Sequence, residues 1–450
     1  MIHSHAVRDR DPVRIALTGA NGGYGRTLLA QLRSTPELVP ALLVEPDADG
    51  MRRTLAELGL DAGAITDGAD VDWSGVDVLI EASGKVAAGT GYATAALEHG
   101  VHVVMVSKEV DTVAGVALAA RAAEAGLRYL PGDGDQPANL LRLLDWVTAT
   151  GLEVVAIGKS GEYDLVLDPA TGVVTQAGAT VHAPGLVDLL DLGADVRATL
   201  ARRAELVAGL KRSAAADLCE MTVVATRCGA VPDREDLHYP VARVTELADV
   251  YAAREHGGLL ERSGVIDVFS ALRLPDEASF AGGVFAVVRT GDPVTWELLR
   301  GKGHVVSRDG RYACLYWPYH AMGVETPLTV HAAVDGTGPA HAPSPSVLLA
   351  ARTATALDAG TEFTVAGHHH EIDGVTPVVV APEPGAAPYY LLDGARLRRP
   401  VAAGELVRLD DLEGLAPGPL DAHLFAQAQI AQAQIAQAQV AAAATEGVQA

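Results

Sequence analysis

The chain reads Thr18-Gly19-Ala20-Asn21-Gly22-Gly23-Tyr24-Gly25-Arg26 between an apolar run, residues 13–17, and a helix-favouring segment, residues 27–33. The order is strand, glycine turn, helix. Glycines at this spacing let the backbone turn tightly and approach a pyrophosphate, and a helix N-terminus offers free N–H groups and a positive dipole end. The stretch therefore predicts a dinucleotide-binding turn. A purely structural glycine turn is the alternative.

An acidic residue ends the next apolar run, residues 39–44. Glu45, with Asp47 behind it, stands where an acid can bind the adenosine ribose hydroxyls. Glu45 argues for NAD because a carboxylate repels a 2′-phosphate, whereas Arg52 and Arg53 could accommodate one, so the expected cofactor is NADP or NAD. The expected cofactor-binding residues are Gly19, Asn21, Gly22, Tyr24, Gly25, Glu45, Ser83 and Ser107.

Residues 13–158 alternate apolar runs with helical stretches rich in alanine and leucine. This alternation predicts an α/β fold of Rossmann type, a doubly wound parallel sheet with helices on both faces. The predicted helices cover residues 26–33, 50–58, 89–99, 112–125 and 136–149. Beyond a helical region from about residue 186 to 226, further runs predict a second sheet, with strands at residues 263–272, 282–289 and 312–317.

Composition narrows the class of protein. The chain has 450 residues and a formal net charge of -23, which argues against nucleic acid and anionic membrane surfaces as partners. Residues 1–12 lack the apolar core of a signal peptide, and no apolar run is long enough to span a bilayer. The three cysteines match no zinc motif or disulfide framework. A cytoplasmic protein acting on a small molecule is expected.

Lysine is rare in this chain. Of the 34 basic residues only five are lysines, Lys85, Lys108, Lys159, Lys211 and Lys302. The first three each follow an apolar run, and ligands of open α/β sheets bind beyond the carboxyl ends of the strands. We therefore expect Lys108 and Lys159 to be catalytic, since an ammonium can stabilise an alkoxide and deliver a proton. Lys211, in a helical stretch away from the strand ends, is expected to matter less. Chance survival of surface lysines is the alternative.

Acidic residues and one histidine complete the catalytic candidates. Glu109 follows Lys108, and Asp135 lies in the loop 131–137, where capping of the next helix is the alternative role. His320 and Glu325 share a proline-flanked polar loop with Tyr319. The expected catalytic set is Lys108, Lys159, Glu109, Asp135, His320 and Glu325.

One acid stands inside an apolar helical segment. Glu220, within residues 217–224, would need a buried partner or a metal, or would become protonated. Exposure at a helix end or interface is the alternative.

The C-terminal third differs in composition. A linker rich in proline, glycine and serine, residues 336–346, precedes a β-rich module. The triplet His368-His369-His370 reads as a solvated loop, because adjacent side chains on a strand point to opposite faces. The tail repeats Ala-Gln-Ala-Gln-Ile and predicts a loosely docked helix without a catalytic part.

These motifs together resemble a known family. They are the glycine turn, Met105 to Asp111, Gly134-Asp135-Gln136-Pro137, Gly158-Lys159, and Pro318-Tyr319-His320 with Glu325-Thr326-Pro327. They are similar to homoserine dehydrogenase-like NAD(P)-dependent oxidoreductases with a C-terminal SAF domain, whose best-defined type is the 1-deoxy-D-xylulose-5-phosphate reductoisomerase-like enzyme.

The resemblance, which covers about residues 13–415, implies a Rossmann domain at residues 1–150, an α/β catalytic and dimerisation domain at 151–335 and an SAF domain at 347–415. The Ala/Gln-rich tail at 421–450 follows from its own repeat. The resemblance also implies NADP(H), a homodimer or higher homo-oligomer and, for reductoisomerase activity, a divalent metal such as Mg²⁺ or Mn²⁺, whose ligands stay unknown. The expected function is an NAD(P)-dependent oxidoreductase acting on a small polar hydroxy or keto metabolite, phosphorylated or not. A non-hydride metabolite-binding protein with a vestigial nucleotide fold is the alternative.

Overall fold

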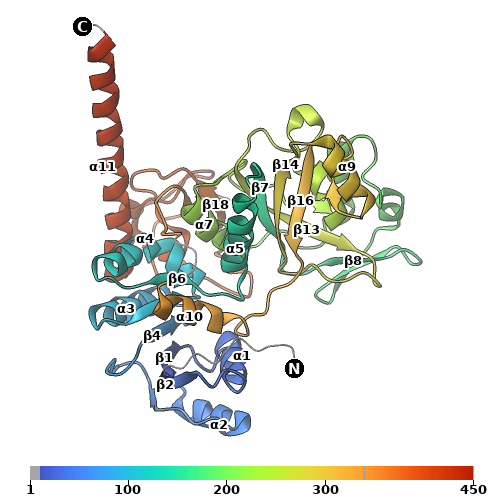
Figure 1. The fold of residues 1–450 in the computed structure, drawn as a ribbon. Helices are drawn as coiled ribbons and strands as arrows, with labels where there is room; N and C mark the ends of the chain where they lie inside the picture. The colour runs from blue at the N-terminus through green and yellow to red at the C-terminus, as the bar shows by residue number, and fades with distance from the viewer. Residues whose placement is uncertain (1–10, 338–340, 449–450) are drawn as a thin grey trace. The chain divides into compact units, whose positions relative to one another are not determined.

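The computed structural model describes residues 11–337 and 341–448, with the backbone alone for 433–448 (Figure 1). The predicted linker at 336–346 thus includes three residues, 338–340, that lie outside the described part. The chain divides into two compact units. Unit 1 comprises Met1–Asp135, Ala321–Thr364 and Ala381–Ala450, and unit 2 comprises Gln136–His320 and Val365–Val380.

Unit 1 contains a six-stranded parallel sheet in the order β3-β2-β1-β4-β5-β6. The strands are β1 (Val13–Thr18), β2 (Leu38–Val44), β3 (Ala64–Thr66), β4 (Val78–Glu81), β5 (His102–Met105) and β6 (Tyr129–Pro131). Strand order reverses between β1 and β4, and the carboxyl ends of strands at such a switch point form the usual ligand crevice. The predicted Rossmann sheet is confirmed.

Helices cover both faces of this sheet. Alternate residues of β1 show why: Ile15 and Leu17 belong to one apolar core with α1 and α2, whereas Ala16 belongs to a second core with α3 and α4. Both faces are buried, so the strands read as nearly continuous apolar runs. The helices are α1 (Gly23–Leu32), α2 (Ala48–Leu58), α3 (Val86–Glu98) and α4 (Lys108–Glu124).

The end of the chain adds to unit 1. Helix α10 (Thr326–Asp335) contributes Val330 to the core that contains α1. Helix α11 (Pro417–Val448), red in Figure 1, packs against α4 and places Ala422 in the second core. Short elements lie between these helices: β17 (Leu348–Thr353), η4 (Tyr389–Leu392), β19 (Arg396–Leu397), η5 (Leu409–Asp411) and β20 (Leu412–Glu413), of which β19 and β20 pair antiparallel.

Unit 2 is built on a mixed sheet whose main path runs β10-β9-β8-β13-β7-β14-β16-β15. β7 lies in its middle, parallel to β13 and antiparallel to β14. The strands of this sheet are β7 (Val154–Ser160), β8 (Leu165–Asp168), β9 (Val173–Gln176), β10 (Ala179–His182), β11 (Val231–Pro232), β12 (Val241–Ala242), β13 (Val265–Arg273), β14 (Val284–Arg289), β15 (Val305–Val306) and β16 (Tyr312–Trp317). Unit 2 also contains β18 (Val375–Val380), which lies outside this sheet.

The helices of unit 2 surround a core that includes stacked and edge-on aromatic rings of Tyr251, Phe269 and Phe285. They are α5 (Gln136–Ala149), η1 (Pro184–Leu189), α6 (Val196–Leu206), α7 (Ala215–Cys228), η2 (Val244–Glu246), α8 (Leu247–Val250), η3 (Arg254–His256) and α9 (Pro293–Gly301). Within the described residues, no helix combines the length and apolar character needed to cross a bilayer.

Three predicted helix starts are wrong by three residues or more. α1 begins at Gly23 and α3 at Val86, each three residues before the predicted start, and α4 begins at Lys108, four residues before it. Sequence reasoning placed Lys108 and Glu109 in a loop, but both lie in the first turn of α4. The reason is geometric: parallel strands in such sheets are joined to their helices by very short turns.

One buried ion pair connects α6 with η1, β12 and η2 in unit 2. The Arg203 side chain is fully buried and donates to both carboxylate oxygens of Glu246, at 2.7 and 2.8 Å, and to the carbonyls of Leu189, Leu190 and Val241. A charge removed from water in this way needs its partner, because an uncompensated buried charge is costly.

We predict that Arg203→Met lowers the free energy of unfolding by about 3–5 kcal/mol, since Glu246 is left buried and unpaired. Arg202→Met is the matched control, because Arg202 and its partner Glu205 are both exposed and such pairs contribute about 1 kcal/mol or less. Urea unfolding of both variants checks this. Equal losses would show that burial does not decide the strength of the pair.

Candidate functional site

The glycine turn of unit 1 follows β1 at the switch point of the sheet. Gly19 has a φ of +61°, and a Cβ there would lie 2.5 Å from the carbonyl oxygen of Ala82. A Cβ on Gly25 would lie 2.5 Å from the oxygen of Ala20. These two glycines are therefore required by the packing of the turn.

Gly22 and Gly23 differ from the other two glycines. Gly22 has an ordinary φ of -69° and forms the N-cap of α1 without a side-chain cap, and nothing lies within 4 Å of a Cβ built on Gly23. The first N–H groups of α1 have no intrahelical acceptors. The turn thus offers open backbone donors and the positive end of a helix dipole, the features that hold a pyrophosphate.

Glu45 lies beside this turn. One of its carboxylate oxygens accepts the backbone N–H of Asn21 at 3.0 Å, and the other accepts that of Asp47 at 3.3 Å. The Asn21 side-chain oxygen accepts the hydroxyl of Thr54 at 2.7 Å. The carboxylate expected to meet a ribose is therefore fixed next to the glycine turn.

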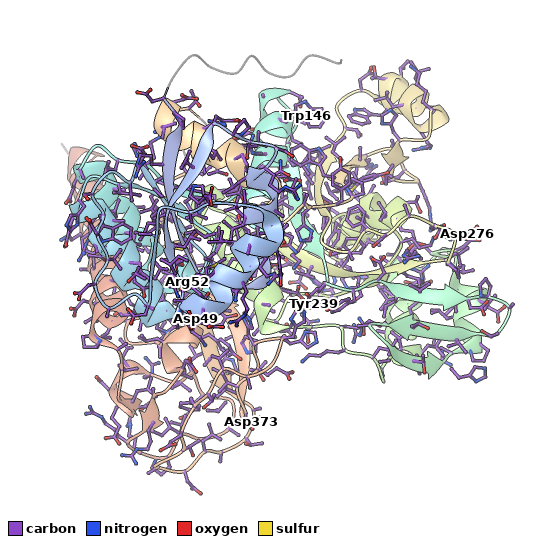
Figure 2. All side chains as sticks on the ribbon, turned by 90° about the horizontal axis from the view of Figure 1, so that it is seen from below. Asp49, Arg52, Trp146, Tyr239, Asp276 and Asp373 are labelled. Atoms are coloured by element: carbon purple, nitrogen blue, oxygen red, sulfur yellow. The ribbon has the colours of Figure 1, made fainter. Side chains whose placement is uncertain are left out.

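The two arginines that could meet a 2′-phosphate are exposed on α2. Arg52, which Figure 2 labels beside Asp49, pairs with that residue at 2.6 Å. Arg53 lies 3.8 Å from Asp47. Each guanidinium thus has a carboxylate neighbour within its own unit.

A buried acid at the end of β4 was not singled out from the sequence. Glu81 is fully buried and accepts the backbone N–H and the hydroxyl of Ser83 and the hydroxyl of Thr18. Burial raises the pKa of its carboxyl, against the lowering effect of hydrogen bonds with Ser107, Ser83 and Thr18. Ser107 follows β5 at the same carboxyl edge of the sheet, and its hydroxyl accepts the N–H of Gly84 at 2.8 Å. The signal available in the sequence was an acid directly ending the apolar run 78–80.

Lys108 is fixed at the start of α4. Its ammonium donates to Asp135 at 2.9 Å, and both side chains are largely buried. Glu109 is buried beside it. Glu325 comes from the far end of the sequence: its carboxylate accepts the N–H of Ala321, and this segment packs on Gly134, next to Asp135. Unit 1 thus brings together four of the six catalytic candidates.

Tyr24, on α1, is hydrogen-bonded to the first residue of α10. Its hydroxyl is hydrogen-bonded to that of Thr326, which also reaches the carbonyl of Asp133 at 3.2 Å. Burial raises the pKa of Tyr24, with the bond to Thr326 opposing. The phenol is therefore neutral and engaged within the protein, and its expected contact with a cofactor stays a prediction.

His320 belongs to unit 2. Its ring packs against Gly282, where a Cβ would lie 2.1 Å from the imidazole Nδ1, so glycine is required there. Tyr319 beside it is 69% exposed. The catalytic role expected for His320 stays a prediction.

Lys159 lies on β7 at the centre of unit 2, with a side chain 2% exposed. Its ammonium donates to Asp217, at 2.7 Å, and to Glu220, one helical turn apart on α7. Burial alone would lower the pKa of Lys159, but the two carboxylates outweigh it and raise the pKa. One alternative from the sequence was that Glu220 is buried and has a partner. The structure shows this, and the partner is Lys159.

The two carboxylates of this cluster exceed its one ammonium. Burial raises the pKa of Asp217, and the charge of Glu220 adds to the rise while Lys159 opposes it. The Tyr239 hydroxyl approaches Asp217 at 3.4 Å. The arrangement can keep Lys159 positively charged and hold a proton on or near Asp217.

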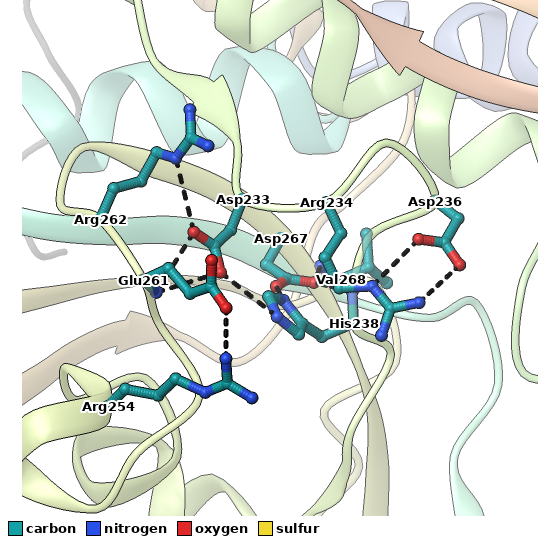
Figure 3. Close-up of polar contacts among 9 residues, drawn as sticks. All are labelled: Asp233, Arg234, Asp236, His238, Arg254, Glu261, Arg262, Asp267 and Val268. Carbon is teal, nitrogen blue, oxygen red and sulfur yellow. Dashed lines mark hydrogen bonds and ion pairs between the residues drawn. The ribbon is translucent and has the colours of Figure 1, made fainter.

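The loop carrying Tyr239 is strained and clamped. Leu237 and Tyr239 have positive φ values of 57° and 46°, which side-chain-bearing residues rarely adopt. Between them, His238 donates its backbone N–H to Asp267 at 2.9 Å, and its ring bonds the same carboxylate at 2.5 Å (Figure 3). The other ring nitrogen lies 3.4 Å from Asp233. The His238–Asp267 contact holds the loop that presents Tyr239.

A cavity of about 320 Å³ adjoins this cluster. Asp217 lines it, as do Lys211 and Arg212 from the segment between α6 and α7. The expectation that Lys211 lies in a helical stretch is wrong, because α6 ends at Leu206 and α7 begins at Ala215. That Lys211 matters less than Lys108 or Lys159 stays a prediction. A larger depression, about 630 Å³, lies on α9 and contains only Glu297 and Lys302 as charged residues.

The described residues contain no group of three or more His, Cys, Asp or Glu side chains arranged to hold a metal ion. The carboxylates of Asp217 and Glu220, which could otherwise ligate a metal, accept hydrogen bonds from the Lys159 ammonium.

Two family models match the chain. Residues 21–131 match the NAD-binding domain of homoserine dehydrogenase, and residues 134–326 match the catalytic domain of the oxidoreductase DRL. The chain thus carries an NAD-binding domain followed by an oxidoreductase catalytic domain, which supports an NAD(P)-dependent oxidoreductase. None of the curated proteins is significantly similar to it.

Solved structures show more distant similarity. The 1-deoxy-D-xylulose 5-phosphate reductoisomerase of Zymomonas mobilis is 20% identical over 34% of this chain and 46% of its own, with a TM-score of 0.26. A putative oxidoreductase of Bacteroides fragilis is 13% identical over 74% and 92%, with a TM-score of 0.33. The myo-inositol dehydrogenase of Lactobacillus casei is 14% identical over 35% and 48%, with a TM-score of 0.28. The chain spans less than half the length of the first three structures found.

Gly22→Ala is predicted to weaken NADH binding at least tenfold while the protein stays folded, because the new Cβ points to space that a pyrophosphate would need. Its nearest protein atom would be the Gly19 oxygen at 3.2 Å, a small adjustment. Gly25→Ala should instead destabilise the fold by about 1–3 kcal/mol, through overpacking. Fluorescence titration and urea unfolding separate the two effects. Unchanged affinity in Gly22→Ala would remove the turn from the cofactor site.

His238 should stabilise unit 2 in a pH-dependent way. Burial alone would lower its pKa, but the hydrogen bond and charge of Asp267, together with Asp233, outweigh burial and raise the pKa, with Arg234 opposing. A raised folded-state pKa means that the stabilisation is fully present below the unfolded pKa, about 6.5, and is lost as pH rises through the folded pKa.

His238→Gln is therefore predicted to cost about 1.5–3 kcal/mol of unfolding free energy at pH 6, the usual range for a charged hydrogen bond, and less at pH 8.5. Urea unfolding at the two pH values measures this, with exposed His182→Gln as the control. An equal loss of unfolding free energy at both pH values would contradict a charged His238 bound to Asp267.

Proposed function

We propose that the protein transfers a hydride between a nicotinamide cofactor and a carbon–oxygen bond of a small polar hydroxy or keto metabolite. The observation that carries the proposal is the buried Lys159 ammonium, held by two carboxylates of which one, Asp217, lines a cavity. The NAD-binding and oxidoreductase family matches supply its class.

The nicotinamide, when bound, supplies or accepts the hydride. In the direction of reduction, negative charge develops on the substrate oxygen, and a fixed positive charge in a dry environment stabilises it strongly. Lys159 provides this charge, and its raised pKa means that it acts as an ammonium and not as a base at neutral pH. Asp217, whose pKa is raised, is the group of this cluster at the cavity wall that can hand a proton to the substrate oxygen.

The groups of unit 1 have a different task. The glycine turn and the N-terminus of α1 would hold the pyrophosphate, and Glu45 the ribose. We favour NAD over NADP, because Glu45 would repel a 2′-phosphate and Arg52 is paired with Asp49. Lys108 is ion-paired with Asp135 at the carboxyl edge of the sheet, where Glu109 and Glu325 are its neighbours. We assign Lys108 a polar contact with the bound ligand.

Other expectations from the sequence stay predictions. These are the SAF module at residues 347–415, the predicted domain boundaries, the homo-oligomeric state and the cytoplasmic location. The reductoisomerase and homoserine dehydrogenase reactions are the two types of hydride chemistry that the resemblance suggests.

Lys159→Met is predicted to lower turnover about a hundredfold or more, the scale of losing an oxyanion partner, with NADH affinity nearly unchanged. Lys108→Met should also lower turnover, and Lys302→Met, at the exposed end of α9, should not. The assay follows the absorbance of reduced nicotinamide across a panel of hydroxy and keto metabolites.

Loss of Lys159 leaves two buried carboxylates without a counter-charge, which could unfold the protein. The folded fraction is therefore checked by thermal unfolding. The double variant Lys159→Met with Glu220→Gln removes one of these charges and keeps the test usable. Failure of the wild-type protein to bind NADH or NAD would overturn the proposed function and favour a non-hydride metabolite-binding protein.

A further inference from the structure

The cavity beside Asp217 contains a guanidinium without a carboxylate. Arg212 is half-buried and donates to the carbonyl of Tyr239 at 3.0 Å. Among the residues that the structure describes, no carboxylate lies within ion-pair distance of it. Other cations of this region are paired: Lys211 with Glu371, and Lys159 with Asp217. A half-buried cation with no counter-charge is a place where an anionic ligand would gain the most.

A second polar residue, Ser270, belongs to the lining of the same cavity. The hydroxyl of Ser270, on β13, is buried, with the whole residue 2% exposed, and makes no hydrogen bond to any described residue. Ser270 is part of the cavity lining. Buried hydroxyls are nearly always satisfied, so this one calls for a ligand or water.

The start of α7 adds further donors. The helix begins at Ala215, and its N-cap, Ala214, has no side chain able to cap it. Ala214 lines the cavity, and so does Ser213 before it. An uncapped helix N-terminus presents open N–H groups and a positive dipole end. Arg212, Ser270 and the two residues before α7 thus all belong to the lining of this cavity.

Charge balance selects the kind of oxyanion. Lys211 is matched by Glu371, and Glu162 on the cavity wall accepts a hydrogen bond from His368 at 2.6 Å. Arg212 is thus left without a carboxylate partner, and Glu162 on the cavity wall would repel a second negative charge on a ligand. A monoanion fits this balance better than a dianion.

We propose that this cavity binds the carboxylate of a small hydroxy acid through Arg212, the Ser270 hydroxyl and the N-terminus of α7. The volume of about 320 Å³ suits a compact metabolite, and Gln176 and Tyr163 on the lining can meet its hydroxyls. The inference rests on the proposed function, since it names the substrate class for the cavity at the Lys159 cluster.

Three four-carbon probes of similar size test it by calorimetric titration: D-erythronate, a carboxylate; erythritol, which is neutral; and erythritol 4-phosphate, a dianion. Erythronate should bind the wild-type protein at least tenfold more tightly than either of the others. Arg212→Gln should weaken erythronate binding about tenfold to a hundredfold, the scale of a charged hydrogen bond, and leave erythritol unaffected. Ser270→Ala should weaken it by a smaller factor, about two- to tenfold.

Arg197→Gln, an exposed position on α6, is the matched control and should change nothing. Ser270→Ala removes one buried atom and keeps the test decisive should Arg212→Gln fold poorly. Equal binding of erythronate and erythritol, or no effect of either variant, would overturn the proposal. Tighter binding of the phosphate ester would overturn the carboxylate assignment.

A parallel NADH titration separates the two hypotheses. If NADH binds and erythronate does not, the carboxylate inference fails and the proposed hydride transfer stands. If erythronate binds with the predicted selectivity and neither NADH nor NAD binds, the hydroxy-acid site stands and hydride transfer fails.

Discussion

The burial of one ammonium between two carboxylates determines much of unit 2. Lys159 could not lie on a central strand without counter-charges, because an unpaired buried charge is far more costly than the marginal stability of a domain allows. Asp217 and Glu220 supply the counter-charges from α7, and this fixes the rotation of that helix against the sheet. The start of α7, the Arg212 segment before it and the cavity wall follow from the same constraint.

A second layer of contacts holds this arrangement from behind. Asp267 on β13 lies next to β7 in the sheet, opposite Gly158 in register. It binds His238, whose two chain neighbours, Leu237 and Tyr239, both adopt the left-handed backbone conformation. Strain of this kind persists only where the surroundings over-determine it, and it is concentrated at functional sites.

The sequence predicted best what depends on local pattern. The alternation of apolar runs and helices gave the parallel sheet, and the spacing of glycines gave the turn after β1. The rarity of lysine drew attention to Lys159 before its partners were known. Glu220 was suspected of needing a partner, but which cation it would meet depends on the rotation of α7, a tertiary property.

Long-range packing set the limits of prediction. Arg212 and Ser270 are 58 residues apart and have ordinary sequence neighbours, so no local pattern could place them on one cavity wall. Lys108 was expected in a loop although Ser107 stands at the N-cap position and Glu109 and Asp111 are acids of the first helical turn, a start signal that was not recognised. Glu81 was overlooked because a single acid at the end of a run is common, and its burial emerges only once the sheet is assembled.

Helix α10 has a consequence for how the chain is made. It completes one face of the unit 1 sheet, with Val330 in the core beside α1, yet it is encoded after the whole of residues 136–320. A ribosome releases the six strands of that sheet long before the helix that covers them, and at about 5–20 residues per second the delay is on the order of ten seconds or more. During this interval the uncovered face exposes apolar surface, so the nascent chain presents a binding surface for chaperones that the finished protein no longer has.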